Sequence, residues 1–306
     1  MNRPLTPIRC ACTCFALALL LRQPAAAQQA VDSTALRPDS TIQPKKSYWQ
    51  ASLNYMSDNV YLGRKDSVKI PYLVPGIGYY HSSGLFADLS AACATIPGDY
   101  HIDLISLEAG YAITKGNFDG QIAASKYYYS SQSYSVRSEI KGSVVADAGY
   151  DLQWIKPTLE ATLNFDNATD YGIGLGLQRT FYAAGDAIDF TPSFVANAGT
   201  QNYYNSYYKR RRYSRTRNGK TIKGTITATV IDPSAFRILD YEASLPVNYT
   251  LHKFVFSFTP TLAFPVDPAM LSRTVDPDNG APATKTVVFE KLQNNFFWTL
   301  GLTYKF

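Results

Sequence analysis

The 306-residue chain ends in Phe296-Phe297-Trp298-Thr299-Leu300-Gly301-Leu302-Thr303-Tyr304-Lys305-Phe306. Every second side chain from Trp298 to Phe306 is large and apolar, whereas the side chains between them are small, polar or charged. Successive side chains of a β-strand point to opposite faces of its sheet. This period of two therefore predicts a strand with one apolar face and one polar face.

The same alternation extends from this stretch back to Tyr48 and predicts twelve strands. The expected ranges are 47–57, 70–81, 85–95, 102–113, 118–128, 138–150, 154–165, 170–181, 187–199, 236–249, 253–264 and 288–306. Connections after even-numbered strands are tight, as at Ser82-Ser83-Gly84, and those after odd-numbered strands are mostly longer. This rhythm is typical of an all-β fold, a transmembrane antiparallel up-and-down β-barrel.

The ends of the strands separate this fold from a soluble β-sandwich, which would alternate in the same way. The apolar faces repeatedly end in aromatic residues, as at Tyr55, Tyr79, Tyr111 and Tyr150, which suits the aromatic girdles of a membrane barrel. The last strand, closing on Phe306, resembles the C-terminal signal of Gram-negative outer-membrane β-barrels. In that family the barrel assembly machinery recognises this signal. The matching residues are Trp298, Leu300, Leu302, Tyr304 and Phe306.

The resemblance implies an outer-membrane location, with outer-membrane lipid and lipopolysaccharide around the barrel. The N-terminus supports export, because Arg3 and Arg9 precede an apolar run at 15–21 that small residues follow. That run is much shorter than the ~20 residues of a transmembrane helix. We expect a signal peptide at 1–27, a flexible periplasmic leader at 28–46 and the barrel at 47–306.

Composition narrows the possible classes further. With 46% hydrophobic and 17% charged residues, the chain is not intrinsically disordered as a whole. Three of its four cysteines lie in the predicted signal peptide, so Cys93 alone can form neither an intrachain disulfide nor a zinc–thiolate cluster. Removal of the signal peptide would also lower the formal net charge from +5 to +2. The distribution of charge is therefore more informative than its sum.

Prolines interrupt four of the apolar faces, at Pro75, Pro157, Pro192 and Pro260. Proline cannot donate a hydrogen bond to a neighbouring strand. We predict local β-bulges at these positions, and the alternation leaves the strand register there open.

The polar faces would line the lumen, and they carry more acids than bases. The acids are Asp88, Glu108, Asp119, Glu139, Asp147, Glu160, Asp189, Asp240 and Glu242, and the bases are Lys141, Lys156 and Lys305. One interpretation is a packed network of ion pairs and hydrogen bonds that fills a narrow barrel. The other is a pore that favours cations or polyhydroxylated solutes. We expect a non-enzymatic barrel, with passive diffusion of small hydrophilic solutes as its function.

The most unusual segment is a long extracellular hairpin that we predict at 200–235. Residues 201–224 carry eight positive charges and no acid, and Asn218-Gly219 is a strong hairpin-turn signal. Such a segment can be a solvated loop, a gate folded over the acidic lumen, or a surface-binding element that makes the barrel a structural protein of the envelope. The candidate anion-binding residues, for lipopolysaccharide phosphates or surface glycans, are Lys209, Arg210, Arg211, Arg212, Arg215 and Arg217. Nucleic acid is not an expected partner at the cell surface.

Signals for catalysis are sparse. The H-x-S core at His81-Ser82-Ser83 is similar to that of outer-membrane phospholipase A and the lipid A deacylases, which implies a lipid hydrolase with His81 as base and Ser83 as nucleophile. Gly84 stands where those families have asparagine, and Ser-Ser-Gly also suits a hairpin turn. The spacing Asp276-x-Asp278-x-Gly280 lacks the closing glutamate of a calcium loop. We therefore predict no catalytic site, no metal site and no cofactor.

Overall fold

The described part of the chain, in a computed structural model, covers residues 46–65, 69–131, 133, 135–204, 212–217, 220–277 and 282–306. The predicted signal peptide, the leader up to residue 45, and Lys209 to Arg211 lie outside these ranges. The described residues form nineteen strands and a short helical turn at 202–204. No helix within them is long and apolar enough to cross a bilayer.

The strands are β1 (Tyr48–Met56), β2 (Tyr72–Tyr80), β3 (Leu85–Ile96), β4 (Asp99–Lys115), β5 (Phe118–Tyr129), β6 (Gly142–Tyr150), β7 (Lys156–Phe165), β8 (Asp170–Gln178), β9 (Phe181–Ala183), β10 (Ile188–Phe190), β11 (Ser193–Gly199), β12 (Arg212–Arg217), β13 (Lys220–Val230), β14 (Arg237–Ser244), β15 (Val247–Leu251), β16 (Phe254–Pro265), β17 (Met270–Pro277), β18 (Thr284–Phe289) and β19 (Asn295–Lys305).

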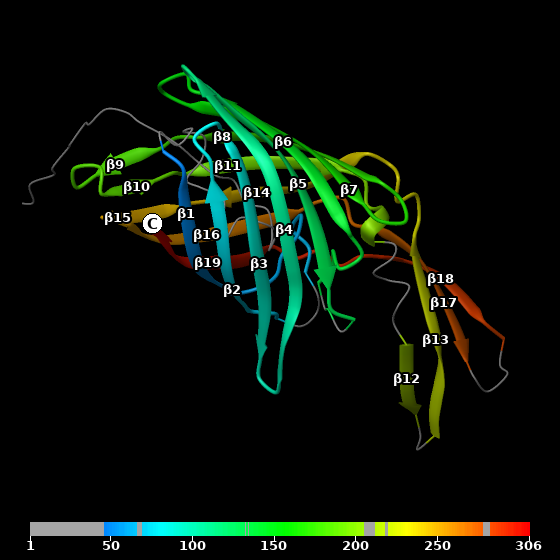
Figure 1. Cartoon of the computed structure of the whole chain (residues 1–306). Coiled ribbons are helices and arrows are strands. Elements are labelled where there is room, and N and C mark those ends of the chain that lie inside the picture. The colour runs from blue at the N-terminus through cyan, green and yellow to red at the C-terminus, as the bar shows by residue number, and fades with distance from the viewer. Residues whose placement is uncertain are drawn as a thin grey trace, which may run out of the picture.

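Twelve of these strands close an antiparallel ring. Strands β1 to β8 pair in chain order, and β11, β14, β16 and β19 continue the sheet until β19 pairs with β1 (Figure 1). The closing register places Leu53 opposite Leu302, so the terminal strand lies beside the first strand. The predicted twelve-stranded barrel is confirmed.

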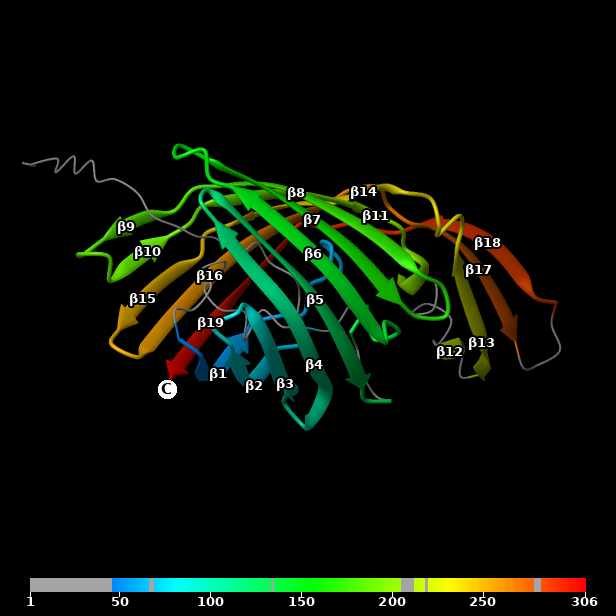
Figure 2. The ribbon, with the colours of Figure 1, turned by 45° about the horizontal axis from the view of Figure 1, so that its top comes forward.

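Three neighbouring strands of the ring are interrupted near one end. Breaks separate β8 from β9, β10 from β11 and β14 from β15, and two of these breaks contain Pro192 and Pro246. Proline carbonyls still accept hydrogen bonds there, from Thr191 N to Pro246 O (2.9 Å) and from Leu245 N to Pro260 O (3.1 Å). Beyond the breaks, β9, β10 and β15 continue as an extension of the wall, at the opposite end from β12, β13, β17 and β18 (Figure 2).

The prediction of bulges at the four prolines is wrong. The ladder beside Pro75, Pro157 and Pro260 keeps its register, although the β2–β3 ladder skips Val74 and Pro75, and Pro192 lies in a strand break. A proline removes one donor, which leaves a gap in the ladder but adds no residue. The register shifts instead occur where Asp103 on β4 and Leu239 on β14 are extra residues.

The two faces of the wall have opposite chemistry. On β4, Leu107 is 43% exposed, while Ser106 and Glu108 on either side of it are 2% and 6% exposed. The same alternation places large apolar side chains on the outside of every strand of the ring, as with Leu53, Ile77 and Ile173. An apolar exterior and a polar interior reverse the arrangement of a soluble protein and match a barrel whose solvent is lipid.

A second, four-stranded sheet projects from the outer end of the barrel in the order β12-β13-β17-β18, and we call it the projecting sheet. Its β12–β13 hairpin falls within the hairpin predicted at 200–235. The predicted strand ranges imply a loop at 265–287 and a single strand at 288–306, and both expectations are wrong. Residues 270–277 form β17, which pairs with β13, and β18 ends before β19 begins. Sequence rich in Thr and Val has a high strand propensity. Here β13, which is distant in the sequence, supplies the strand with which β17 pairs.

We expect Leu107→Arg to lower the free energy of unfolding in phospholipid vesicles by about 2–4 kcal/mol, because arginine would face the hydrocarbon near mid-strand. Tyr100→Arg is the control, since Tyr100 lies at the outer tip of β4 and is 70% exposed. Guanidinium titration followed by tryptophan fluorescence measures both. Equal losses in the two variants would contradict a lipid-facing wall.

Candidate functional site

Most of the predicted lumen residues lie on the inner face of the ring. Asp88, Glu108, Asp119, Lys156, Asp189, Asp240 and Glu242 are buried, and Asp147 and Glu160 are half-buried. Glu139 and Lys141 precede β6, which begins at Gly142 rather than at 138. Lys141 is exposed and lies 3.6 Å from Asp166, and the Lys305 ammonium lies 5.7 Å from the ring centre of Tyr48.

Five of the inner carboxylates have well-formed partners, four of them on a neighbouring strand and Lys156 two strands away from Asp119. These are Tyr80 Oη for Asp88 (2.7 Å), Ser125 Oγ for Glu108 (2.7 Å), Lys156 Nζ for Asp119 (2.5 Å), Asn248 Nδ2 for Asp189 (2.8 Å) and Asn197 Nδ2 for Asp240 (2.9 Å). Buried carboxylates need such partners, because an unpaired buried charge is costly. At these positions the geometry is that of a packed network.

Asp147 and Glu160 differ from the buried acids. They face each other directly in the β6–β7 register and are only half-buried. Glu160 accepts a hydrogen bond from Thr162 Oγ1 (3.1 Å). This side of the wall therefore carries two adjacent acidic residues that are partly exposed.

The outer mouth of the ring is occupied by protein. The described parts of segments 57–71, 130–141 and 200–204 fold inward, and we call them the mouth plug. Their apolar side chains form one cluster with the strand residues around them. The buried members are Met56, Tyr61, Ile70, Tyr72, Val74, Ala92, Ala94, Leu104, Tyr127, Val136, Ile140, Tyr203, Tyr204, Val230, Ala269 and Leu271.

Tyr61 shows that the plug crosses the barrel. It belongs to the loop that follows β1, yet its hydroxyl accepts a hydrogen bond from Asn164 Nδ2 on β7 (3.1 Å). In the twelve-strand ring β7 is six strands from β1 in either direction, so the two strands lie on opposite walls. The Tyr61 ring also makes a T-shaped contact with the ring of Tyr203 from the third segment (5.2 Å between centres).

The β4 bulge holds the middle segment of the plug. The extra residue turns Asp103 inward, where it is buried beside Leu104. Its carboxylate accepts hydrogen bonds from the Tyr72 hydroxyl, from Ser130 Oγ (3.3 Å) and from Ser133 Oγ (2.9 Å). Asp103 is not among the predicted lumen residues, because a bulge adds one residue to the alternation without an obvious local signal in the sequence.

An aspartate on β8 holds the third segment in a similar way. Asp170 accepts hydrogen bonds from the backbone N–H groups of Asn202 (2.7 Å) and Tyr203 (2.8 Å) and from Thr200 Oγ1 (2.6 Å). These contacts fix the short helical turn at 202–204 against the inner wall. Carboxylates that accept backbone N–H groups are strong anchors for a loop.

Arg137 lies at the centre of the plug, among tyrosine rings. Its guanidinium carbon is 4.5 Å from the ring centre of Tyr61 and 5.3 Å from that of Tyr127. Burial lowers the pKa of Arg137 to about 9 and raises the pKa of Tyr61 well above its ordinary value. Arginine over the face of an aromatic ring is a stabilising arrangement when both groups are removed from water.

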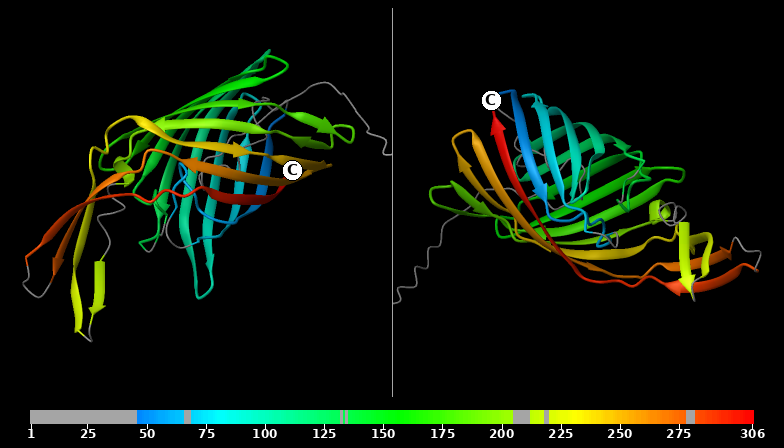
Figure 3. Two further views of the ribbon diagram at one scale, coloured as in Figure 1. Left: turned by 180° about the vertical axis from the view of Figure 1, so that it is seen from behind. Right: turned by 90° about the horizontal axis from the view of Figure 1, so that it is seen from below.

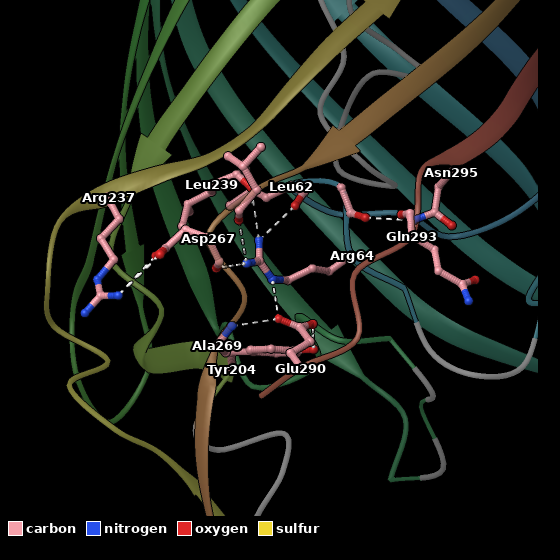
Figure 4. A network of polar contacts seen from close by, with 12 residues as sticks. Leu62, Arg64, Tyr204, Arg237, Leu239, Asp267, Ala269, Glu290, Gln293 and Asn295 are labelled. Atoms are coloured by element: carbon pink, nitrogen blue, oxygen red, sulfur yellow. Dashed lines mark hydrogen bonds and ion pairs between the residues drawn. The ribbon is translucent and has the colours of Figure 1, made fainter. Parts of the chain in front are cut away.

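Arg64 connects the plug to the base of the projecting sheet (Figure 4). Its side chain is 1% exposed, and its Nε donates to Glu290 Oε2 at 3.3 Å. The other guanidinium nitrogens donate to four carbonyls, those of Leu62 (3.2 Å), Leu239 (3.4 Å), Val266 (3.4 Å) and Asp267 (3.1 Å). The Leu239 carbonyl belongs to the extra residue of the β14 bulge, so the bulge supplies an acceptor for this arginine.

Glu290 completes the Arg64 network. It accepts the Tyr204 hydroxyl and the backbone N–H of Ala269 (3.1 Å), so one carboxylate joins the third plug segment to the start of β17. Gly63, with φ +69°, precedes Arg64, and a Cβ there would come within 2.8 Å of Pro265. Only glycine fits this close approach without strain.

The remaining candidate sites are the predicted anion-binding arginines and the His81–Ser83 pair. Arg212, Arg215 and Arg217 are on β12, and in the right-hand view of Figure 3 the projecting sheet lies to one side of the ring. This position of β12 and β13 does not support the hypothesis that the basic hairpin covers the lumen.

His81 Nδ1 lies 2.8 Å from Ser83 Oγ, in an exposed turn between β2 and β3. The Ser83 backbone N–H donates to the same nitrogen (3.2 Å), which is the geometry of a capped turn. Within the described residues no group of three or more His, Cys, Asp or Glu side chains is placed to hold a metal ion.

Comparisons with known proteins do not assign the chain to a family. No family model and no curated protein matches the chain. Among solved structures, it is similar to a bacterial polysaccharide outer membrane secretin (9% identity, 86% of this chain, 99% of that chain, TM-score 0.38). It is also similar to BamA from Haemophilus ducreyi lacking POTRA domains 1–3 (8%, 85%, 70%, 0.37) and to a porin (10%, 85%, 99%, 0.30).

The closed antiparallel β-barrel of this chain is established by its own strand pairing. TM-scores below 0.5 and identities of 10% or less carry no information on its activity.

We expect Arg64→Met to lower the free energy of unfolding by about 3–5 kcal/mol, because it leaves the Glu290 carboxylate buried without its cation. Adding Glu290→Gln should restore part of this loss, since the remaining side chain is neutral. Guanidinium titration of the two variants in detergent measures the difference. If adding Glu290→Gln instead lowers the free energy of unfolding further, the unpaired charge of Glu290 is not the cause of the loss in Arg64→Met.

Proposed function

We propose that the protein is a non-enzymatic channel of the outer membrane for small hydrophilic solutes, with an outer mouth that the plug narrows. The observation that carries the proposal is the closed ring with an apolar exterior and a polar, acid-rich interior. Such a wall is stable in lipid and offers water-like contacts inside. The apolar exterior and the predicted export signal both support the outer membrane as the location.

The half-buried pair Asp147 and Glu160 supports a preference for cations. Two adjacent carboxylates on the accessible part of the lumen wall attract cations and repel anions, and a low-dielectric wall strengthens this effect. The fully buried acids contribute less, because their side chains are removed from the accessible part of the lumen.

The mouth plug predicts a low resting conductance. Its core is apolar, and it crosses from the β1 loop to β7, so a hydrated solute has to displace or bypass it. A hydrophobic constriction is a recognised way to restrict flow through a pore.

The proposal is non-enzymatic because His81 and Ser83 form a turn rather than a pocket. The Nδ1 atom of His81 already accepts the Ser83 backbone N–H, and both residues are exposed.

A variant that loosens the plug should conduct more than the wild type. Val136 and Ile140 are buried in the plug and lie outside the strands, so Val136→Asp with Ile140→Asp should disrupt the plug and spare the ring. We expect larger and more frequent single-channel events in planar bilayers. Ile102→Asp, on the outer face of β4, is the control. If neither the wild type nor the plug variant conducts, with folding verified for both, the channel proposal is overturned.

Selectivity tests the lumen carboxylates separately. The second test adds Asp147→Asn and Glu160→Gln to the Val136→Asp, Ile140→Asp variant. In a potassium chloride gradient, these changes should shift the reversal potential toward the equilibrium potential of chloride. The amides keep the size of the side chains and remove their charge. Ser272→Asn, on the projecting sheet away from the lumen, should leave the reversal potential unchanged. An unchanged value in the double amide variant would show that these acids do not face the path of the ions.

A further inference from the structure

Strand β18 is exposed along its whole length. It is the edge strand of the projecting sheet, and all six of its residues are solvent-accessible. Three of them are large and apolar, with Phe289 65%, Val287 57% and Val288 37% exposed. An exposed apolar edge strand is a liability in water, because it offers both hydrophobic surface and unpaired backbone groups.

The register of the sheet separates the two faces of β18. Val288 lies opposite Leu271, and Leu271 is buried in the cluster of the mouth plug, so this face is the inner one. Val287 and Phe289 alternate with Val288 and therefore lie on the outer face. Lys285 shares that outer face, two residues farther from the barrel.

The outer face of β18 continues the apolar wall of the barrel. Phe296, the second residue of β19, is 63% exposed, and Phe236 and Ile238 at the outer end of the wall are 52% and 48% exposed. Figure 3 shows that the projecting sheet extends away from the ring to one side. A bilayer in contact with Phe296 and Ile238 would therefore extend beneath the projecting sheet.

Charge along the projecting sheet complements a lipid headgroup layer. Moving outward on this face of β18, apolar Phe289 and Val287 are followed by the cation Lys285. In the sequence of the other strands, β12 and the outer part of β13 carry only positive charges, whereas β17 contains both Arg273 and Asp276. Apolar side chains followed by cations match the order of acyl chains and anionic phosphates in a leaflet.

We propose that the projecting sheet is a membrane-surface element, whose outer face lies on the lipid of the outer leaflet around the barrel. Val287 and Phe289 enter the acyl region, and Lys285 lies at the level of the phosphates. This inference rests on the proposed membrane position of the barrel but not on its channel activity.

Depth-dependent fluorescence quenching tests the contact. The native cysteines are replaced by serine, a single cysteine is introduced as Val287→Cys, and it carries an environment-sensitive dye. The protein is inserted into vesicles of phosphatidylcholine and phosphatidylglycerol whose acyl chains are brominated. We expect at least a two-fold greater quenching of the dye at 287 than at the matched control Thr286→Cys, because adjacent residues of a strand face opposite sides.

Leu107→Cys, in the mid-wall, separates the two proposals. Quenching at 107 without quenching at 287 would overturn the membrane-surface element and leave the barrel in the bilayer. No quenching at either site would overturn the membrane position itself. A dye at 287 that is shielded from both brominated lipid and aqueous iodide would indicate a second copy of the chain on this face, which also overturns the lipid contact. Lys285→Glu should reduce quenching at 287 only when phosphatidylglycerol is present.

Discussion

The pairing of β1 with β19 is the constraint on which the rest of the structure depends. In lipid there is no water to satisfy exposed backbone N–H and C=O groups, so a sheet can cross only if it has no free edge. Closure joins the two ends of the described barrel through seven consecutive residue pairs, from Gln50–Lys305 to Met56–Thr299. It also fixes which face of each strand meets the lipid, since a shift of one residue would exchange the apolar and polar faces.

Closure then determines what the interior has to do. A twelve-stranded ring encloses more volume than its own wall side chains fill, and its acids cannot be left unpaired in that volume. The chain meets both requirements with polar partners across strands, such as Lys156 for Asp119, and with loops that fold inward. The two bulges belong to this solution. Asp103 and the Leu239 carbonyl are directed into the barrel because one extra residue in each strand turns them there.

The ring could be predicted from sequence because its signal is local. Alternation with a period of two, repeated twelve times, gave the strand number and most of the wall without any knowledge of pairing. The inward-folded loops could not be predicted in this way. The contact of Tyr61 with Asn164 joins residues 103 positions apart, and that of Arg64 with Glu290 joins residues 226 positions apart. Such contacts depend on which strands become neighbours, and the pairing of β13 with β17 in the projecting sheet was missed for the same reason.

The Arg64 network makes the mouth plug and the projecting sheet parts of one mechanical unit. Arg64 belongs to the plug, and its partners Asp267 and Glu290 flank β17 and β18. Tyr204 adds the third plug segment to the same carboxylate. A displacement of β18 on the lipid surface would therefore act directly on the Arg64–Glu290 pair, and through Tyr204 on the apolar cluster that fills the mouth. The contacts that hold the mouth plug and those that hold the base of the projecting sheet therefore share the Arg64–Glu290 pair.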